Sequence, residues 1–275
     1  MSASSDSEAV FSGARAALLA ACDEMERRLH GLVDSHGKVA EEIHQLRKLG
    51  KRLRGALAMV GEPKPCIRWI AVIGRMLGGS RDSMVRAKTW RSLGVDSTAS
   101  GAVETAIRDL LDLEADASIR KPPAGVTEWS LAAVKQVKAR IESQSDAEVA
   151  VKAAKGAALL RRRLKRRLKK ALDRVTNEDF HDCRKAAKAW LGGLSIVAAS
   201  LAVPAQEETE KLAGNLGDEN DLEVLAVWLE SRGFSPATAK TPWKVLRKRQ
   251  EKIRRRSISL IRKDLLPALT GKGKD

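Results

Sequence analysis

The stretch EEIHQLRKLGKRLRGAL, residues 41–57, threads five lysines and arginines between evenly spaced leucines and carries one histidine. On a helix that advances about 100° per residue, one side collects the apolar residues Leu46, Leu49, Leu53, Leu57 and Val60. The opposite side carries a stripe of His44, Lys48, Lys51 and Gly55, flanked by Arg47 and Arg54. We therefore predict an amphipathic helix with a cationic face. Glycine weakens a helix interior by roughly 1 kcal/mol relative to alanine, so Gly55 indicates a close approach to the backbone.

The same pattern recurs 137 residues further along the chain. IHQLRKLGKRLRGAL (43–57) falls on FHDCRKAAKAWLGGL (180–194), which pairs His44 with His181, Arg47 with Arg184, Lys48 with Lys185, and Lys51 with Lys188. A shift of 139 residues lays LGGSRDSMV (77–85) on LGDENDLEV (216–224). Two matches in the same order at nearly one offset predict an internal duplication. The second copy has Ala189 and Leu191 where the first has Arg52 and Arg54.

The composition is that of a strongly basic, helix-forming chain. Fifty-one Lys and Arg against 35 Asp and Glu give the 275 residues a net charge of +16 and a pI near 10.0. The apolar fraction of 43% suits a folded core, and the scarcity of Phe, Tyr and Pro favours helices over strands. The excess positive charge attracts polyanions, among which nucleic acid, acidic membrane surfaces and polyphosphate are candidates.

Local periodicity predicts a succession of helices separated by Gly-, Pro- and Ser-containing breaks. We expect them at 9–33, 37–60, 64–77, 81–93, 99–114, 126–142, 146–174, 177–200, 205–214, 219–232 and 236–265. The duplication divides the chain into a disordered head (1–8), a first helical repeat (9–145), a second helical repeat (146–268) and a flexible tail (269–275).

Other sequence signals are mostly negative. No apolar stretch approaches the length of a membrane span, and no basic segment precedes a short apolar run as in a signal peptide. Three widely spaced cysteines indicate reduced thiols in a cytoplasmic protein. The histidines and cysteines lack metal-ligand spacing, and there is no P-loop, so we expect no metal, no cofactor and no catalysis. Asp82 and Asp221, which recur in the LG segments, are expected to cap helices or to hold an Arg or His.

The doubled H-x-x-R-K-x-x-K pattern, each copy followed by a helical LG segment, resembles the CHAD family (conserved histidine α-helical domain) over about residues 13–268. The resemblance implies an all-α fold of two four-helix bundles related by pseudo-two-fold symmetry. It also implies a basic central pore or cleft that binds inorganic polyphosphate. One half would face this site with His44, Arg47, Lys48, Lys51, Arg52 and Arg54. The other half would contribute His181, Arg184, Lys185 and Lys188.

A further basic run, LLRRRLKRRLKKALDR (159–174), has Leu160, Leu164, Leu168 and Ala171 as its apolar stripe. Its cations form either a solvated face or a second wall of the polyanion site, contributed by Arg162, Arg163, Arg166 and Lys169. The C-terminal segment KVLRKRQEKIRRRSISLIRKDLL (244–266) allows the same two interpretations.

Together with this resemblance, the patterns predict a non-enzymatic polyphosphate-binding protein of the cytoplasm, associated with polyphosphate granules. One alternative is a helical RNA- or DNA-binding protein, because the same net charge permits nucleic acid as a partner. Another is an enzyme of phosphate or nucleotide metabolism, although no nucleophile or metal cluster supports it. We expect no membrane partner, and the sequence leaves the oligomeric state open.

Overall fold

The computed structural model describes residues 10–34, 39–95, 101–117, 122–199 and 203–270, and all regular structure within these ranges is helical. The first half contains α2 (Ala14–Asp34), α3 (Val39–Met59), α4 (Lys64–Met76), α5 (Gly79–Ser92), α6 (Ala102–Ala117) and α7 (Ala124–Glu142). The second contains α8 (Asp146–Arg174), α9 (Asn177–Val197), α10 (Gln206–Ser231), α11 (Lys240–Leu260), the π-helical turn η2 (Ile261–Leu265) and α12 (Leu266–Thr270). The all-α prediction is confirmed.

One predicted break was wrong. The segments 205–214 and 219–232 form the single helix α10, which continues through Gly217. A β-carbon at Gly217 would have nothing within 4 Å, whereas the flanking Leu216 and Leu222 are buried. Packing of these leucines outweighs the low helix propensity of the glycine. The predicted head, and the tail beyond Thr270, lie outside the described residues.

Local capping explains where α8 and α9 begin. The Ser145 hydroxyl accepts a hydrogen bond from the Glu148 backbone, and the Glu148 carboxylate accepts one from the Ser145 backbone, which forms a capping box at the start of α8. Val175, at φ 53°, ends α8 in the left-handed conformation. Thr176 then caps α9 by accepting from the Asp179 backbone. These caps place His181 in the second turn of α9.

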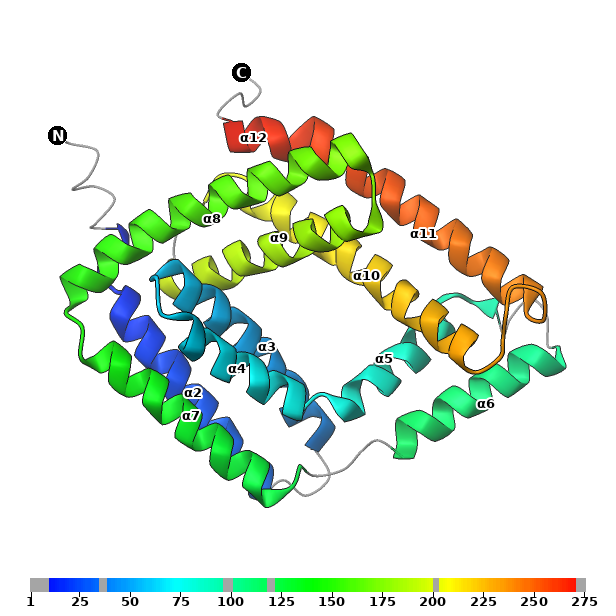
Figure 1. The fold of residues 1–275 in the computed structure, drawn as a ribbon, viewed down its shortest axis with the longest axis horizontal. Coiled ribbons are helices and arrows are strands. Elements are labelled where there is room, and N and C mark those ends of the chain that lie inside the picture. The colour runs from blue at the N-terminus through cyan, green and yellow to red at the C-terminus, as the bar shows by residue number, and fades with distance from the viewer. Residues whose placement is uncertain (1–9, 35–38, 96–100, 118–121, 200–202, 271–275) are drawn as a thin grey trace.

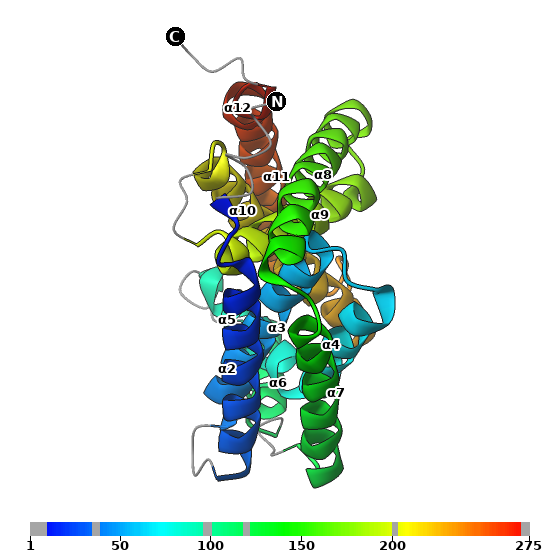
Figure 2. The same ribbon diagram turned by 90° about the vertical axis from the view of Figure 1, so that its left-hand side faces the viewer.

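The buried hydrophobic side chains form two clusters, and each cluster draws on both halves of the chain. The larger cluster joins α2, α3, α4, α7, α8 and α9 with the first half of α10, η2 and α12. The smaller cluster joins α5, α6, the second half of α10, and α11. Figure 1 shows these parts arranged around the middle of the molecule, and Figure 2 shows α2 and α7 side by side along one edge. The clusters do not follow the repeat boundary, so the arrangement as two bundles stays a prediction.

The helices that carry the two motif copies, α3 and α9, pack most extensively against each other. A β-carbon at Gly55 would lie 2.6 Å from the Ala189 carbonyl oxygen and 2.7 Å from the Gly193 nitrogen. One at Gly192 would lie 3.2 Å from the Arg52 Cα. The close approach that Gly55 predicted is therefore the approach of the other motif helix. This crossing closes the cationic stripe of α3 at its Gly55 end. The His44 end of the stripe stays open.

We predict that Gly55→Ala lowers the free energy of unfolding by about 1–3 kcal/mol, because the added methyl group meets rigid backbone and forces α3 and α9 apart. Urea denaturation followed by circular dichroism measures the change. Gly217→Ala is the matched control. It adds the same methyl group to an open helix position and should raise stability by about 0.5–1 kcal/mol. Equal effects of the two substitutions would contradict the close crossing.

Candidate anion-binding site

A groove of about 650 Å³ lies between α3, α9 and α10. Its charged lining consists of His44, Lys48, Lys51, Arg52, Lys188 and Glu210. The rest of the lining is small or apolar, namely Leu191, Gly192, Ser195, Ala213 and Gly214. We call this site the basic groove. It brings together five of the fourteen predicted site residues, and they come from both motif copies.

The two sides of α3 explain the groove. Opposite the stripe, Leu46, Leu53 and Leu57 are buried in the core and Leu49 is half-buried, whereas Lys48 and Lys51 are exposed. Lysines three residues apart lie about one helical turn from each other, so both ammonium groups reach the same space. Lys188 of α9 joins them because the helices cross one turn away, at Gly192.

The wall contributed by α10 was missed by the sequence analysis. It consists of Ala213 and Gly214, with Glu210 one turn before. The sequence signal for this wall is the adjacent pair of small residues, Ala213 and Gly214, because small side chains in a helix leave space in front of the cations. With a helix predicted to end at residue 214, these small residues would be a helix terminus rather than the middle of a continuous wall.

Arg52 lines the basic groove but is already held by α9. Its Nε donates to the Ser195 hydroxyl at 2.8 Å, and its Nη2 donates to the Ser195 carbonyl oxygen at 2.7 Å. The Ser195 hydroxyl in turn donates to the Gly192 carbonyl at 3.0 Å. This guanidinium is a fixed positive charge in the wall, whereas the neighbouring lysines end in mobile ammonium groups.

Two arginines predicted for the site do not line the basic groove. The Arg47 guanidinium lies over Gly78 and is 3.7 Å from the Asp82 carboxylate. This contact confirms Asp82 as a salt-bridge partner. The pKa of Arg54 is lowered, because its guanidinium is partly desolvated and lies near that of Arg75. The Arg47 side chain therefore extends from α3 toward α5, and neither arginine lines the basic groove.

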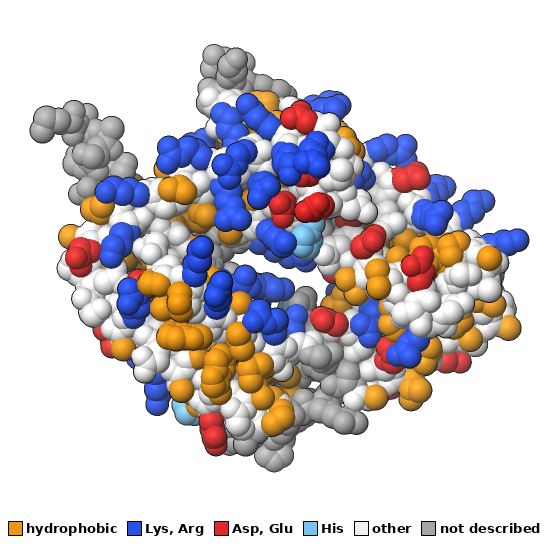
Figure 3. Space-filling model, in the orientation of Figure 1, with side chains coloured by type: hydrophobic (Ala, Val, Ile, Leu, Met, Phe, Trp, Pro, Cys, Tyr) orange, Lys and Arg blue, Asp and Glu red, His pale blue; other side chains and the backbone are white. Residues whose placement is uncertain are grey.

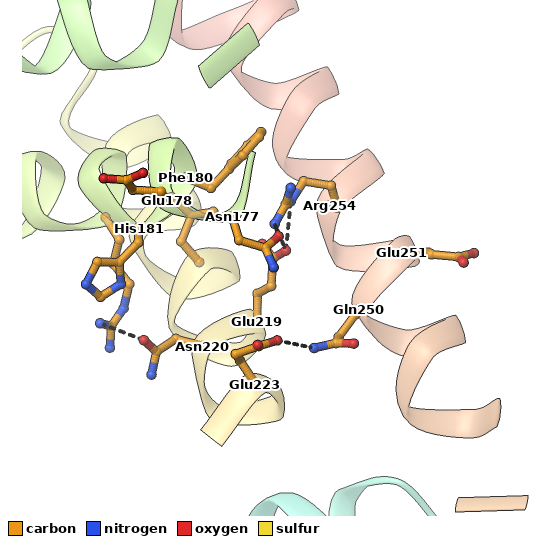
Figure 4. A pocket seen from close by; sticks show the side chains of 12 residues that line it. Asn177, Glu178, Phe180, His181, Glu219, Asn220, Glu223, Gln250, Glu251 and Arg254 are labelled. Carbon is orange, nitrogen blue, oxygen red and sulfur yellow. Dashed lines mark hydrogen bonds and ion pairs between the residues drawn. The ribbon is translucent and has the colours of Figure 1, made fainter. Parts of the chain in front are cut away.

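The histidine of the second copy lines a separate pocket of about 480 Å³ (Figure 4). It is lined by His181 and Glu178 of α9, by Glu219, Asn220 and Glu223 of α10, and by Gln250, Glu251 and Arg254 of α11. Arg184 also lines this pocket, and its guanidinium donates to the Asn220 side-chain oxygen at 3.4 Å. Four carboxylates in the lining make this pocket a poorer host for an anion than the basic groove.

The first copy has a counterpart of this pocket, of about 530 Å³. Its lining includes Ala40, Glu41, His44 and Met84, which lie 137 or 139 residues before Asn177, Glu178, His181 and Glu223 in the other pocket. The duplication therefore extends from the motif to the hollow in front of each histidine. His44 differs from His181 because it lines the basic groove as well.

The environment of His181 disfavours its protonated form. Desolvation lowers its pKa below the ordinary value of 6.5, and the positive charges of Lys185 and Arg184 lower it further, against a smaller opposite effect of Asp182. Lys185 itself is exposed and lies 3.8 Å from the Asp182 carboxylate. An anion that approached these cations would favour the protonated imidazole.

The cations of α8 divide between two sides of that helix. On the side toward α9, Arg167 pairs with Asp182 at 3.0 Å, and Lys170 pairs with the buried Asp179 at 2.8 Å. On the outer side, the four predicted site residues are exposed, and none of them lines the basic groove: Arg162, Arg163, Arg166 and Lys169. The buried stripe of Leu160, Leu164, Leu168 and Ala171 is as predicted.

The cysteines and the possible metal ligands add no reactive group. Cys22, Cys66 and Cys183 are buried free thiols, and burial raises the pKa of Cys22 and of Cys183 to about 12. Over the described ranges, no cluster of His, Cys, Asp and Glu side chains is suited to hold a metal ion. No helix in this part of the chain has the length and apolar character needed to cross a membrane.

Comparison with known proteins decides the family. A family model described as the CHAD domain matches residues 16–230. The chain belongs to the CHAD family. Its fold is similar to the crystal structure of the CHAD domain from the plant Ricinus communis, with a TM-score of 0.52 and 19% sequence identity over 95% of this chain and 90% of that one. No curated protein matches the sequence. The resemblance identified from the doubled motif is thus confirmed for this CHAD chain.

We predict that Arg52→Lys lowers the free energy of unfolding by about 1–3 kcal/mol, because lysine keeps the charge but cannot make both hydrogen bonds to Ser195. Thermal and urea denaturation measure the loss. Lys48→Gln is the control on the same helix, and its exposed position should keep the change within about 0.5 kcal/mol. If Arg52→Lys is as stable as the native chain, the guanidinium does not hold α3 to α9.

Proposed function

We propose that this CHAD protein binds inorganic polyphosphate and that the basic groove is the principal binding site. The observation that carries the proposal is the meeting of His44, Lys48, Lys51, Arg52 and Lys188 in one groove, with Glu210 as the single acidic side chain in its lining. A groove with such a surplus of positive charge attracts a chain of phosphates. A net charge of +16 adds to this attraction from a distance.

The form of the basic groove suits a thin, flexible polyanion. Lys48 and Lys51 offer mobile point charges, which can follow phosphates in more than one position. Gly214 leaves part of the α10 wall without a side chain, so phosphate oxygens can approach the backbone closely there. The fixed guanidinium of Arg52 keeps its charge in place when the groove is empty and lowers the reorganisation needed on binding.

A long chain can continue from the basic groove along α9. Lys188, Lys185 and His181 lie on one side of that helix, and the first and last are about 10 Å apart along its axis. Figure 3 shows Lys and Arg side chains gathered around a hollow near the middle of the molecule. We propose that this hollow is the basic pore or cleft expected of the family and that a polyphosphate chain passes along it.

We further propose that the protein binds polyphosphate without hydrolysing it and acts in the cytoplasm at polyphosphate granules. Phosphoryl transfer requires a positioned nucleophile and, in general, metal ions that neutralise the developing charge. The residues of the basic groove are donors of hydrogen bonds and carriers of charge, which suits binding. A phosphate-release assay with Mg²⁺ or Mn²⁺ checks this part of the proposal, and sustained turnover by the purified chain would refute it.

We predict that the triple variant Lys48→Gln, Lys51→Gln and Lys188→Gln binds long-chain polyphosphate about 10- to 100-fold more weakly, because it removes three charged hydrogen-bond donors from the groove. Titration across a salt series measures this. The slope of log affinity against log salt should flatten by about 2, at roughly 0.7 per lost contact as for a flexible single strand.

The matched control is Lys64→Gln, Arg68→Gln and Lys135→Gln, which removes three exposed cations from α4 and α7. It lowers the net charge equally but leaves the basic groove intact. Equal weakening by the two triple variants would show that binding depends on net charge alone, and the groove assignment would then be wrong. Replacing Arg162, Arg163, Arg166 and Lys169 together tests whether the outer side of α8 contributes.

We predict that binding of long polyphosphate strengthens as the pH falls from 8 to 6. The pKa of His181 is below 6.5 in the free protein, and phosphates beside it raise that pKa, so the complex takes up a proton. The affinity for long polyphosphate therefore rises as the pH falls from the His181 pKa of the complex toward the lower pKa of the free protein.

His181→Gln is the control variant. It should flatten the pH dependence of affinity for long chains. The pH dependence for triphosphate should stay unchanged, because triphosphate is too short to reach from the groove to His181. An unchanged long-chain profile in His181→Gln would exclude contact at this histidine.

A further inference from the structure

The helix α11 packs along one side only and leaves most of its surface open. Apart from the π-helical turn that follows it, its main neighbour is α10. Its apolar side is buried there through Trp243, Leu246 and Ile253. No large hydrophobic side chain between residues 240 and 270 is exposed. What α11 presents to solvent is therefore almost entirely polar.

This exposed surface is densely basic. Residues 240–264 contain eleven lysines and arginines against two acids, Glu251 and Asp264. The segment carries a net charge of +9, compared with +16 for the whole chain. Ten of the eleven cations are exposed. The remaining one, Arg254, stacks on the Phe180 ring and pairs with Glu219. Figure 3 shows Lys and Arg side chains along the edge where Figure 1 draws α11.

The exposed cations are distributed around α11 in three rows. Lys244, Lys248, Lys252 and Arg255 form a central row that is about 16 Å long at 1.5 Å per residue. Arg249 and Arg256 flank the row on one side, and Lys240 and Arg247 flank it on the other. At about 100° per residue, the three rows together cover about 200° of the helix circumference. A polyanion that follows a single line can meet only one of these rows at a time.

We propose that α11 binds the backbone of double-stranded nucleic acid. The major groove of a B-form duplex is about 12 Å wide and admits an α-helix, with a phosphate strand on each side. The two flanking rows would meet the two strands, while the central row faces the groove. The 21 residues of α11 extend over about 31 Å, the length of about nine base pairs.

The side chains of α11 suit recognition of the charged phosphate backbone rather than of the base sequence. Base readout uses Asn, Gln and Arg side chains fixed in the groove or aromatic side chains that stack on bases. Here the amide Gln250 is hydrogen-bonded to Glu223, and Trp243 is buried. We therefore expect binding that is independent of sequence and strongly dependent on salt. An anionic membrane is disfavoured, since an interfacial helix inserts an apolar side, and that of α11 is covered by α10.

The nucleic-acid surface lies apart from the basic groove, whereas three other residues of α11, Gln250, Glu251 and Arg254, line the His181 pocket. No residue of α11 lines the basic groove. Loss of binding at one surface should therefore leave the other intact, and each proposal can fail alone.

The test is the triple variant Lys248→Gln, Lys252→Gln and Arg255→Gln, which removes most of the central row. Fluorescence anisotropy with a mixed-sequence duplex of about 20 base pairs, across a salt series, gives affinity and salt slope. We expect about a tenfold or greater loss of affinity, and a slope that is flatter by about 2 to 3. The flank variant Arg249→Gln and Arg256→Gln should also weaken duplex binding, because one phosphate strand loses its partners. The control is the Lys64→Gln, Arg68→Gln and Lys135→Gln variant, and circular dichroism verifies that all variants are folded.

Each outcome decides for or against the nucleic-acid surface. Selective loss of duplex binding in the α11 variants, with unchanged polyphosphate affinity, supports it. Duplex binding that is unchanged, or is reduced equally in the control, overturns it. A parallel loss of polyphosphate affinity would assign α11 to the polyphosphate site instead. A greater loss of binding to vesicles of anionic phospholipid than to the duplex would assign it to membranes.

Discussion

The contact between Gly55 of α3 and the backbone of α9 is the constraint on which the rest of the structure depends. Two helices can approach this closely only where neither presents a side chain, and Gly55 and Gly192 meet that condition on the two partners. The approach fixes both the distance and the register of the two motif helices. It places Lys188 opposite Lys48 and Lys51, and it brings Ser195 within reach of Arg52. The basic groove is therefore a consequence of how the backbones pack.

A second close approach supports the first. A β-carbon at Gly156 of α8 would collide with the backbone carbonyl of Met59, at the end of α3. The Met59 side chain in turn lies against Gly193 of α9. The end of α3 is thus enclosed by glycines from two neighbouring helices. A helix held in this way keeps its cationic stripe at one angle, which a binding site made from long, mobile side chains requires.

Much of this arrangement could be predicted from the sequence, because it follows from periodicity and duplication. The buried leucines of α3 and the cationic stripe opposite them follow from the helical period, and Gly55 was correctly predicted to mark a close approach. The directions of Arg47 and Arg54 could not be predicted in the same way. Both flank the stripe on a helical wheel, and long side chains bend toward whichever partner is near. Asp82, which pairs with Arg47, and Arg75, the like charge near Arg54, belong to helices whose positions are set by tertiary packing.

The continuity of α10 also depends on tertiary packing and therefore could not be predicted from the local sequence. Local propensity treats a glycine as a probable break, whereas a helix of 26 residues is stabilised by the cores it joins. Its first half packs in the larger hydrophobic cluster and its second half in the smaller one. The same helix supplies Ala213 and Gly214 to the basic groove and Glu219 and Asn220 to the His181 pocket. One continuous element therefore connects the two histidine sites, which two separate short helices could not do.

The differences between the motif copies explain why the polar contact between α3 and α9 lies on only one side of their crossing. Arg52 of the first copy bonds to Ser195 of the second. The residues 137 positions away from this pair are Ala189 and Ala58, which can make no such bond. The Ala189 carbonyl oxygen would also lie only 2.6 Å from a β-carbon at Gly55, so the backbone of α9 fills the space beside this position. The polar anchor is thus present on one side of the crossing only. The hydrogen bonds between Arg52 and Ser195 add to the glycine contacts that hold these two similar helices together, and the side of the crossing that carries them forms a wall of the basic groove.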